Sequence, residues 1–146
     1  MKQSNYIKLE FPSKSVNEGF ARTAVACFAA QLDPTLDELG DIKTAVSEAV
    51  TNAIVHAYPD TIGKISLRAR LTEEGGIEIT VRDWGLGIPD IDQARTPMFT
   101  TGGEERSGMG FTIMESFMEK LRVQSVPGKG TTVTMRKKIS IRLGRK

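Results

Sequence analysis

The sequence predicts an α+β fold: a two-layer sandwich with a mixed, mainly antiparallel sheet and its helices on one face. Alternating apolar and polar residues, the pattern of half-buried strands, cover residues 6–11, 65–71, 77–82, 121–126 and 131–139. Helical periodicity covers residues 15–32, 36–57 and 109–120. The short turn at 73–76 joins two of the strands and predicts an antiparallel hairpin.

The first two helices carry start and stop signals. Ser15 is a candidate N-cap, and Glu18 three residues later completes a capping box, so we expect a helix over 15–32. The long helix over 36–57 ends before Pro59, because the residue before a proline disfavours helical geometry.

The expected last helix, 109–120, follows a long loop. Its apolar positions, which we expect to be buried, are Phe111, Met114, Phe117, Met118 and Leu121. The preceding residues 88–107 have little periodicity and several prolines and glycines. A loop of this length inside a compact domain is usually functional.

Length and composition indicate an ordinary globular protein. The 146 residues fit a single domain, 1–146, and 39% apolar and 26% charged residues are typical of soluble proteins. The net charge of +2 argues neither for nor against nucleic acid. The basic tail, 136–146, lacks interleaved aromatic residues, so we expect a solvated strand end and no direct contact with nucleic acid.

The single cysteine, Cys27, excludes an intrachain disulfide. It lies in an apolar stretch, so we expect a buried thiol. The sequence has no signal peptide and no apolar run long enough to span a membrane. We therefore expect a cytoplasmic protein without a membrane partner.

Glu48 and Asn52 stand out in the long helix, because the residues around them are nearly all small or apolar. Positions four apart share a helix face, and His56 extends the same row. Two polar groups on one buried stripe are costly unless something pairs with them, and a bound cation takes such oxygen ligands. The alternative is a hydrogen-bonded polar row within a helix layer. For His56 we favour a structural place near the helix end.

Three glycine motifs follow in order. They are Asp83-Trp84-Gly85-Leu86-Gly87 after a strand, Gly108-Met109-Gly110 at a helix start, and Gly130-Thr131-Thr132 entering a strand. A carboxylate accepts a hydrogen bond from an amine, and the amides of a helix start attract anions. Each motif alone fits an ordinary turn, an unliganded helix start or a strand entry. The helix start is not a P-loop, because no Gly-Lys-Ser/Thr follows it.

The Glu48–Asn52 pair and the three glycine motifs are four motifs in all. In this order and spacing, they resemble the GHKL (Bergerat) ATPase family, which includes gyrase-type, chaperone-type and histidine-kinase ATP domains. Within it, the chain is similar to the small serine-kinase anti-sigma factors of the sporulation type. The stretches that carry this likeness are 47–54, 97–101 and 106–115, and the resemblance covers roughly residues 5 to 138.

The resemblance implies an Mg-ATP site. It implies that Asn52 coordinates Mg²⁺, that Glu48 is the general base, and that Asp83 binds adenine N6. Further ATP-binding residues implied by the family pattern are Gly85, Gly87, Thr100, Thr101, Gly108, Met109, Gly110 and Thr132. Arg106, in the loop that resembles the family's ATP lid, is implied to contact the γ-phosphate; a solvated surface charge is the alternative. The Gly102-Gly103 pair departs from the longer, lysine-bearing lid of the sporulation relatives.

The resemblance also implies a function and partners. The protein would be an ATP-dependent protein serine kinase that binds and inhibits a sporulation sigma factor of the sigma-F type. Its substrate would be the anti-anti-sigma factor, phosphorylated on a serine. A homodimer built from the N-terminal strand and first helix is implied, and Arg22 matches a position used for partner contacts.

Four other readings compete. A stress-response anti-sigma kinase shares most of these motifs. A nucleotide-dependent sigma-binding module without phosphoryl transfer would keep the nucleotide site alone. A histidine-kinase ATP domain usually comes with a phosphoacceptor helix, whereas the only histidine here lies on the nucleotide-site helix. A hydrolytic ATPase of gyrase or chaperone type would need a transducer domain.

Overall fold

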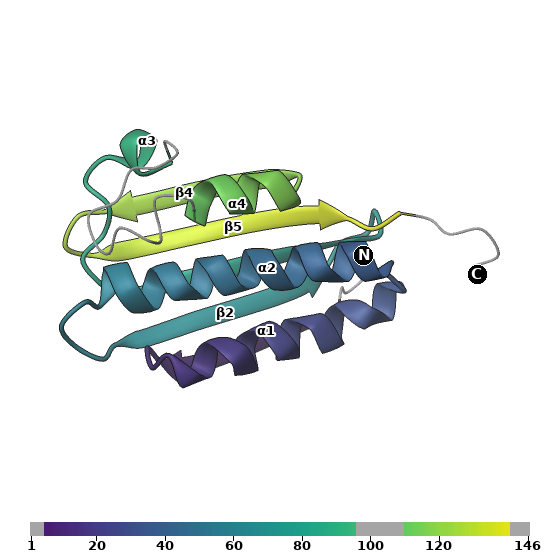
Figure 1. Cartoon of the computed structure of the whole chain (residues 1–146), viewed down its shortest axis with the longest axis horizontal. Coiled ribbons are helices and arrows are strands. Elements are labelled where there is room, and N and C mark those ends of the chain that lie inside the picture. Colours follow the sequence, from purple (N-terminus) through teal and green to yellow (C-terminus); the bar gives the residue numbers. More distant parts are fainter. Residues whose placement is uncertain (1–4, 96–109, 141–146) are drawn as a thin grey trace.

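The computed structural model describes residues 5–95 and 110–140, and in these ranges one five-stranded sheet forms the back of the molecule (Figure 1). Its strands are β1 (Tyr6–Pro12), β2 (Lys64–Leu71), β3 (Gly76–Asp83), β4 (Lys120–Val126) and β5 (Gly130–Lys138). The spatial order is β1-β2-β3-β5-β4. All four pairings are antiparallel, so the described strands form a purely antiparallel sheet.

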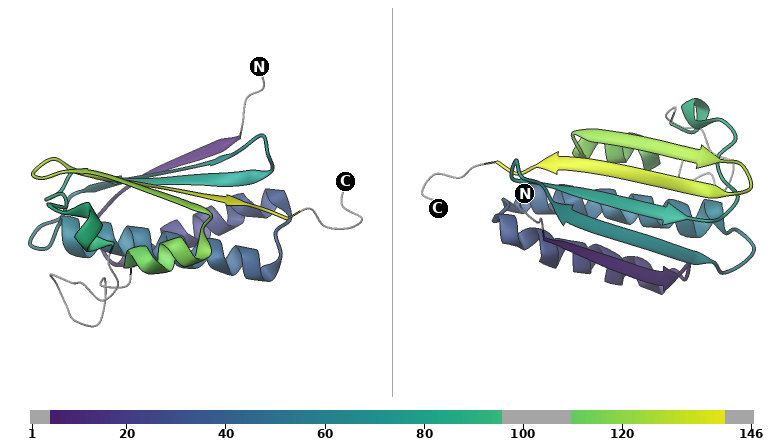
Figure 2. Two further views of the ribbon diagram at one scale, coloured as in Figure 1. Left: turned by 90° about the horizontal axis from the view of Figure 1, so that it is seen from above. Right: turned by 180° about the vertical axis from the view of Figure 1, so that it is seen from behind.

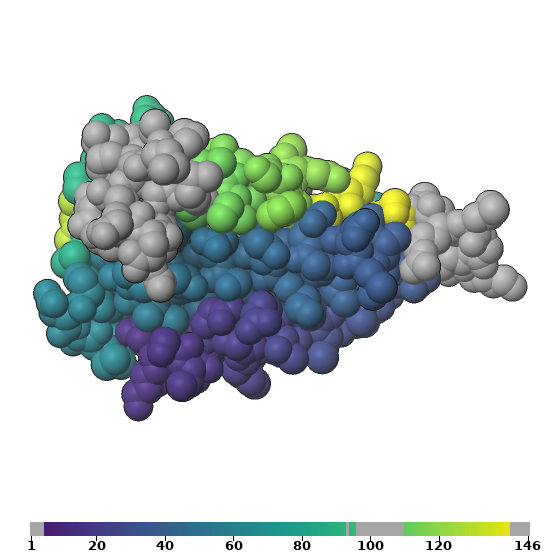
Figure 3. Space-filling model, viewed as in Figure 1, coloured from purple at the N-terminus to yellow at the C-terminus, as the bar shows by residue number. Residues whose placement is uncertain are grey.

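The helices cover one face of this sheet. They are α1 (Val16–Ala29), extended by a 3₁₀ turn (Ala30–Leu32), α2 (Leu36–Asn52), extended by a π-helical turn (Ala53–Ala57), α3 (Ile91–Ala94) and α4 (Gly110–Phe117). From the front, α1, α2 and α4 lie side by side with α2 in the middle (Figure 3). From behind, the strands are in view with no helix over them (Figure 2, right). The predicted two-layer sandwich is therefore confirmed.

The core lies between these two layers. α2 buries a stripe at helical spacing, with Ile42, Val46 and Val50 fully enclosed. The sheet buries every second residue of its central strands, such as Ile65, Leu67 and Ala69 of β2 and Ile77, Ile79 and Val81 of β3. The alternation along the strands and the helical period of α2 thus meet in one apolar layer.

The capping box predicted at the start of the first helix lies instead at the start of the second. Ser15 makes no side-chain capping bond and already has helical dihedral angles. Thr35 is the residue that forms a capping box: its Oγ1 accepts from Glu38 N at 3.0 Å, and Glu38 Oε1 accepts from Thr35 N at 2.9 Å. Extended backbone at Thr35 allows these reciprocal bonds, whereas helical backbone at Ser15 does not.

The last helix is shorter than predicted. α4 ends at Phe117 because the chain at Lys120 pairs with Arg136 of β5. Phe111, Met114 and Met118 are buried as expected, and Leu121 packs against the core partly buried. Phe117 is 37% exposed, because it lies about 90° around the helix from the centre of that buried row.

Cys27 is exposed, contrary to the expectation of a buried thiol. α1 buries Ala21, Val25, Phe28 and Ala29. Cys27 follows Val25 by two residues and so lies about 200° around the helix from it. The residues on both sides of Cys27 are small or apolar, so the sequence did not show which face of α1 is buried.

The C-terminal end of the sheet is tied to the helix layer. Glu38 Oε2 accepts a hydrogen bond from Ser140 N at 2.9 Å, and Lys137 forms an ion pair with Asp41 of α2 at 3.3 Å. Part of the basic tail is therefore paired and not freely solvated. None of the helices in residues 5–95 and 110–140 has the length and apolar character needed to cross a bilayer.

Thr35→Ala should lower the free energy of unfolding by about 1 kcal/mol, because it removes the capping bond at the start of α2. The matched change Ser15→Ala should alter it by less than about 0.5 kcal/mol, because Ser15 makes no capping bond. Urea denaturation followed by circular dichroism measures both. Equal losses in the two variants would contradict the assignment of the capping box to Thr35.

Candidate functional site

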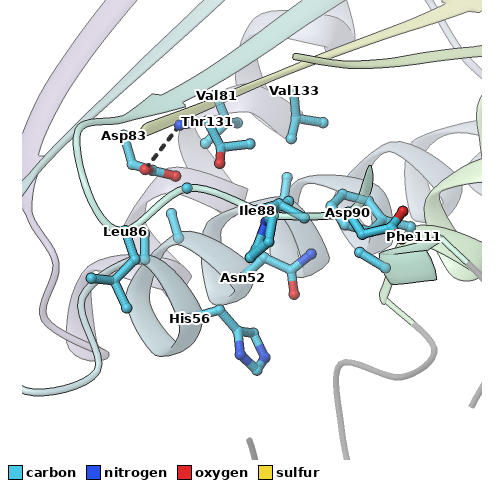
Figure 4. Close-up of a pocket in the computed structure, with 16 residues that line it drawn as sticks. Asn52, His56, Val81, Asp83, Leu86, Ile88, Asp90, Phe111, Thr131 and Val133 are labelled. Atoms are coloured by element: carbon cyan, nitrogen blue, oxygen red, sulfur yellow. Dashed lines mark hydrogen bonds between the residues drawn. The ribbon is translucent and has the colours of Figure 1, made fainter. Parts of the chain in front are cut away.

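A cavity of about 480 Å³ opens between the C-terminal half of α2, the loop after β3, and the start of β5 (Figure 4). Its volume lies in the range of small-molecule sites. The residues that line it are Ala49, Asn52, Ala53, His56, Ala57, Val81, Asp83, Leu86, Gly87, Ile88, Pro89, Asp90, Ala94, Phe111, Thr131 and Val133. Most of this lining is apolar, and a few polar side chains lie among it.

Asn52 of α2 and His56 of the π-helical turn that extends it lie on one side of the cavity (Figure 4). Asn52 is the last residue of the regular helix, and the chain continues as a π-helical turn over Ala53–Ala57. π-helical turns are rare and occur frequently at functional sites. The sequence predicted an unbroken helix to Ala57 and gave no signal for the wider turn.

The π-helical turn is fixed against the loop that follows β3. Ala57 O accepts a hydrogen bond from Leu86 N at 3.1 Å. A Cβ on Gly85 would lie 2.2 Å from the same oxygen, so only glycine permits this approach. Tyr58 Oη accepts from Trp84 N and donates to Lys64 O, both at 2.7 Å. The end of the helix and the loop are therefore held as one unit.

Asp83 is the buried carboxylate of the site. Its Oδ1 accepts from Gly85 N at 3.0 Å and from Thr131 N at 3.2 Å. Figure 4 draws the hydrogen bond from Thr131 as a dashed line. Among the described residues, no donor reaches Oδ2, which leaves this oxygen available to a ligand in the cavity. Burial raises the pKa of Asp83 above its ordinary value, although the two backbone hydrogen bonds oppose the shift.

The glycines after Asp83 have separate roles. Gly87 lines the cavity with φ +79°, a conformation that favours glycine. Gly85 is not part of the lining, and its missing side chain faces Ala57. Of these two predicted site residues, the cavity contains Gly87, while Gly85 positions α2.

The threonine of β5 that faces the cavity is Thr131, so the expectation for Thr132 is off by one residue. Thr131 is buried, donates its amide to Asp83 and lines the cavity. Thr132 pairs with Arg82, a residue of the opposite face, because side chains alternate along a strand. The sequence offered two adjacent threonines, and only the register of β5 distinguishes them.

Ser125 of β4 is a residue that sequence reasoning missed. Its Oγ accepts from Ile88 N at 2.7 Å and lies 2.7 Å from Thr131 Oγ1 and 3.0 Å from Gly130 O. This hydroxyl therefore joins the cavity rim at Ile88 to the cavity floor at Thr131. Nothing in the sequence marks Ser125, because its role depends on the pairing of β4 with β5.

Glu48 lies one turn before Asn52 on α2 but lines a different depression. That groove, of about 330 Å³, lies where α1 packs on α2 and is lined by Arg22, Gly40, Lys43, Thr44, Ser47 and Glu48. Arg22, the predicted partner contact, forms an ion pair with Glu18 at 2.9 Å. The structure thus brings Glu48 and Arg22 together and places Asn52 in the adjoining cavity.

Gly110 begins α4 beside Asn52: a Cβ on Gly110 would lie 3.1 Å from Asn52 Oδ1. The start of α4 therefore lies beside Asn52 of α2, although Gly110 itself is not part of the cavity lining. The other predicted lid and loop residues, namely Thr100, Thr101, Arg106, Gly108 and Met109, lie outside the described residues.

Trp84 lies outside the cavity lining and is 39% exposed. Lys64 Nζ and Arg82 Cζ lie 4.4 Å and 4.6 Å from the centroid of its ring. These are cation–π distances. Trp84 therefore packs against the cationic side chains Lys64 of β2 and Arg82 of β3, and it is not part of the cavity lining.

The side chains of the cavity fit a magnesium nucleotide. Asn52 presents a neutral amide to the cavity, and Mg²⁺ in nucleotide sites is held by one or two protein oxygens together with phosphates and water. Among residues 5–95 and 110–140, no group of three or more His, Cys, Asp or Glu side chains could form an all-protein metal cage. A cation here would depend on ligands that the nucleotide brings.

Comparisons with known proteins agree with this geometry. The sequence model of the histidine kinase-like ATPase domain matches residues 11–137. The anti-sigma F factor of Caldanaerobacter subterraneus is 58% identical over 140 residues, which are 95% of this chain and 97% of that protein. The anti-sigma F factor of Clostridium perfringens is 54% identical over 137 residues, 93% and 98% of the two chains. The chain therefore belongs to the histidine kinase-like ATPase (GHKL) family and, within it, to the group of the anti-sigma F factors.

Solved structures show the same fold. The histidine kinase domain of the Erythrobacter litoralis EL346 blue-light activated histidine kinase matches with a TM-score of 0.56 at 23% identity, over 84% of this chain and 61% of that chain. The mycobacterial sensor histidine kinase MprB matches with a TM-score of 0.54 at 20% identity, over 70% and 76%. At these identities the likeness concerns the fold alone.

Gly85→Ala should lower the free energy of unfolding by about 1–3 kcal/mol, because the added methyl group overlaps Ala57 O and forces the loop away from α2. Gly40→Ala is the matched control: it lies inside α2 with no atom within 4 Å of the added Cβ. The control should gain about 0.5–1 kcal/mol. Urea denaturation compares the two, and a neutral Gly85→Ala would show that the contact with Ala57 does not constrain the loop.

Proposed function

We propose that this chain is an ATP-dependent serine protein kinase and anti-sigma factor. The proposal rests on the two polar residues of α2, which face two different depressions. Asn52 faces the cavity, and Glu48, one turn earlier, faces the adjoining groove. A nucleotide in the cavity and a protein segment in the groove would meet at these two residues.

The cavity suits ATP with its adenine at the Asp83 end. Asp83 Oδ2 would accept a hydrogen bond from the adenine N6 amine, beside the Thr131 hydroxyl. The phosphates would extend toward Asn52 and the start of α4, whose free amides attract anions. Mg²⁺ would bind Asn52 and neutralise the charge of the phosphate oxygens.

In the transfer step, Glu48 would act as the general base. The serine Oγ of a protein substrate would attack the γ-phosphorus while the bond from phosphorus to the oxygen bridging to the β-phosphate breaks, and ADP leaves with that electron pair. The Glu48 carboxylate would take the proton of the serine hydroxyl. Catalysis of this kind depends mainly on positioning and on charge stabilisation.

The groove beside Glu48 supports the choice of a protein substrate. Arg22 and Lys43 supply positive charge, and Thr44 and Ser47 supply hydroxyl groups. We propose that the anti-anti-sigma partner, which carries the acceptor serine, docks here, with Arg22 as a contact. The names of the relatives support a sigma-F type sigma factor as the second partner. β1 is an edge strand beside α1, a position that supports a homodimer built from these two elements.

Asp83→Asn should weaken ATP binding by about 1–3 kcal/mol, because the amide nitrogen would oppose the adenine amine with a donor. Asn Oδ1 keeps both backbone hydrogen bonds, so the fold should be retained. Isothermal titration calorimetry measures the affinity, with Asp60→Asn in the exposed loop after α2 as the control. Unchanged affinity in Asp83→Asn would exclude the adenine contact.

The same variant should be at least as stable as the parent at pH 7. The pKa of Asp83 is raised in the folded state, so the ionised carboxylate opposes folding at pH values above its unfolded value, near 3.8. This disadvantage fades as the pH falls through the raised pKa of the folded state, and it is absent below the unfolded value. The stability gain of Asp83→Asn should therefore shrink as the pH approaches 3.8 in urea unfolding and be lost below it, and a gain that grows on acidification would contradict it.

Glu48→Gln should reduce the rate of phosphoryl transfer to the serine of the partner by about 10²- to 10⁴-fold, because the general base is lost. ATP affinity and sigma-factor binding should remain. Phosphoserine mapping by mass spectrometry after incubation with Mg-ATP and the anti-anti-sigma partner gives the rate.

Asp37→Asn, an exposed acid at the start of the same helix, is the matched control and should transfer at the parental rate. If Glu48→Gln also transfers at the parental rate, Glu48 is not the base. If the parent binds both proteins in a nucleotide-dependent manner yet forms no phosphoserine, the protein is a binding module and not a kinase.

A further inference from the structure

The face of the sheet opposite the helices, called the open face below, lines neither the cavity nor the groove. It consists of the outward side chains of all five strands: Tyr6, Lys8 and Glu10 of β1; Lys64, Ser66, Arg68 and Arg70 of β2; Glu78, Thr80 and Arg82 of β3; Lys120, Arg122, Gln124 and Val126 of β4; and Thr132, Thr134, Arg136 and Lys138 of β5. No helix of the described chain covers this face (Figure 2, right).

Charge is strongly segregated onto the open face. Nine of the 20 Lys and Arg residues lie there, namely Lys8, Lys64, Arg68, Arg70, Arg82, Lys120, Arg122, Arg136 and Lys138, but only two of the 18 acids, Glu10 and Glu78. The rest of the chain, with 11 cations and 16 acids, is therefore acidic. The overall charge of +2 conceals a basic face and an acidic remainder.

The register places like charges directly opposite one another. Lys8 pairs with Arg68 across β1 and β2, and Lys120 pairs with Arg136 across β4 and β5. Directly opposed side chains of an antiparallel pair have Cβ atoms about 4.5–5.5 Å apart, and like charges at this distance are destabilising. An anion bound between them would convert this repulsion into attraction.

Few of these cations are neutralised within the described chain. Glu78 pairs with Arg70 at 2.7 Å and with Arg136 at 2.8 Å, whereas Lys8, Arg68 and Arg122 have no carboxylate within ion-pair distance in residues 5–95 and 110–140. Arg68 lies over the ring of Tyr6, at 5.4 Å from its centroid. The aromatic rings on this face thus position cations and leave their charge available.

We propose that the open face binds the phosphate backbone of a nucleic-acid duplex without reading its base sequence. The row across the middle of the sheet is, in register, Lys8, Arg68, Thr80, Thr134 and Arg122. Arg, Lys and hydroxyl side chains are the usual donors to phosphate oxygens. The guanidinium groups also match phosphate oxygens in a bidentate manner.

The shape of the face favours a duplex over a lipid bilayer. Neighbouring strands are rotated by about 20–25°, so β1 and β4, the two edges of a five-stranded sheet, differ by roughly 80–100°. This twist is visible when the sheet is seen from above (Figure 2, left). A cylindrical duplex fits along the concave diagonal of such a saddle, whereas a planar membrane touches only part of it.

The composition of the face also disfavours a protein partner. Protein interfaces have an apolar core that is depleted of charged residues, but the middle row here has no apolar side chain. The Trp84 ring is occupied by Lys64 and Arg82, so it offers no free platform for stacking of single-stranded bases. This proposal departs from the expectation of no contact with nucleic acid, which rested on net charge and on the basic tail.

The test is fluorescence anisotropy with a labelled DNA duplex of about 20 base pairs and arbitrary sequence, titrated with the full chain. For about four phosphate contacts, raising KCl from about 50 mM to about 200 mM should weaken binding on the order of 100-fold. Arg68→Glu combined with Arg122→Glu should weaken binding at low salt by at least about tenfold. ATP affinity should be retained, because neither residue lines the cavity.

Lys14→Glu combined with Lys129→Glu is the matched control, with the same change in net charge at exposed residues that belong neither to the open face nor to the lining of the cavity or the groove. It should bind DNA nearly as the parent does. Arg68→Glu alone should be as stable as the parent or more so in urea unfolding, because it faces Lys8.

Four outcomes would overturn the proposal. They are no duplex binding at about 50 mM KCl, equal losses in the two double variants, a marked loss of stability in Arg68→Glu, or sedimentation with phosphatidylglycerol-containing vesicles without any binding to the duplex. The last result would identify the open face as a membrane contact.

Discussion

The close approach of α2 to the sheet is the constraint on which the site depends. Four alanines spaced four residues apart, Ala45 and Ala49 of α2 and Ala53 and Ala57 of the π-helical turn that extends it, are all buried. Small side chains at a contact let a helix lie close to its neighbour. Larger residues here would lift α2 and separate Ala57 from Gly85, and the loop after β3 would lose its anchor.

This packing also explains how a carboxylate is kept in an apolar cavity. Asp83 ends β3 beneath the π-helical turn, where burial disfavours its charge. The fixed loop supplies one backbone donor, Gly85 N, and the pairing of β3 with β5 supplies the other, Thr131 N. Both donors reach the same oxygen, so the second oxygen remains for a ligand. The site thus retains a buried carboxylate whose charge opposes folding.

Much of this arrangement follows from sequence patterns with a short physical range. Alternating apolar and polar residues predicted all five strands, and helical periodicity predicted α1, α2 and α4. The four motifs predicted Asn52, Asp83 and Gly87, which line the cavity. The choice between Thr131 and Thr132 was beyond such patterns, because it depends on the register of β5 against β3. Ser125 was missed for the same reason, and the π-helical turn follows from docking against Gly85 and not from local preference. The capping box at Thr35 was within reach of the sequence, since Glu38 follows by three residues, but Ser15 offered the same pattern.

The concentration of Lys and Arg on the open face of the sheet was not predictable from composition, because the net charge does not show on which face each charged residue lies. In β3, Arg82 and Asp83 are consecutive and point to opposite sides of the sheet, one to the open face and one to the cavity. Trp84 follows, with its backbone N–H bound to Tyr58 and its ring under Lys64 and Arg82. A movement of the loop between residues 83 and 87 would therefore displace the Trp84 backbone and disturb two cations of the open face. The open face and the cavity are therefore physically connected at this end of β3.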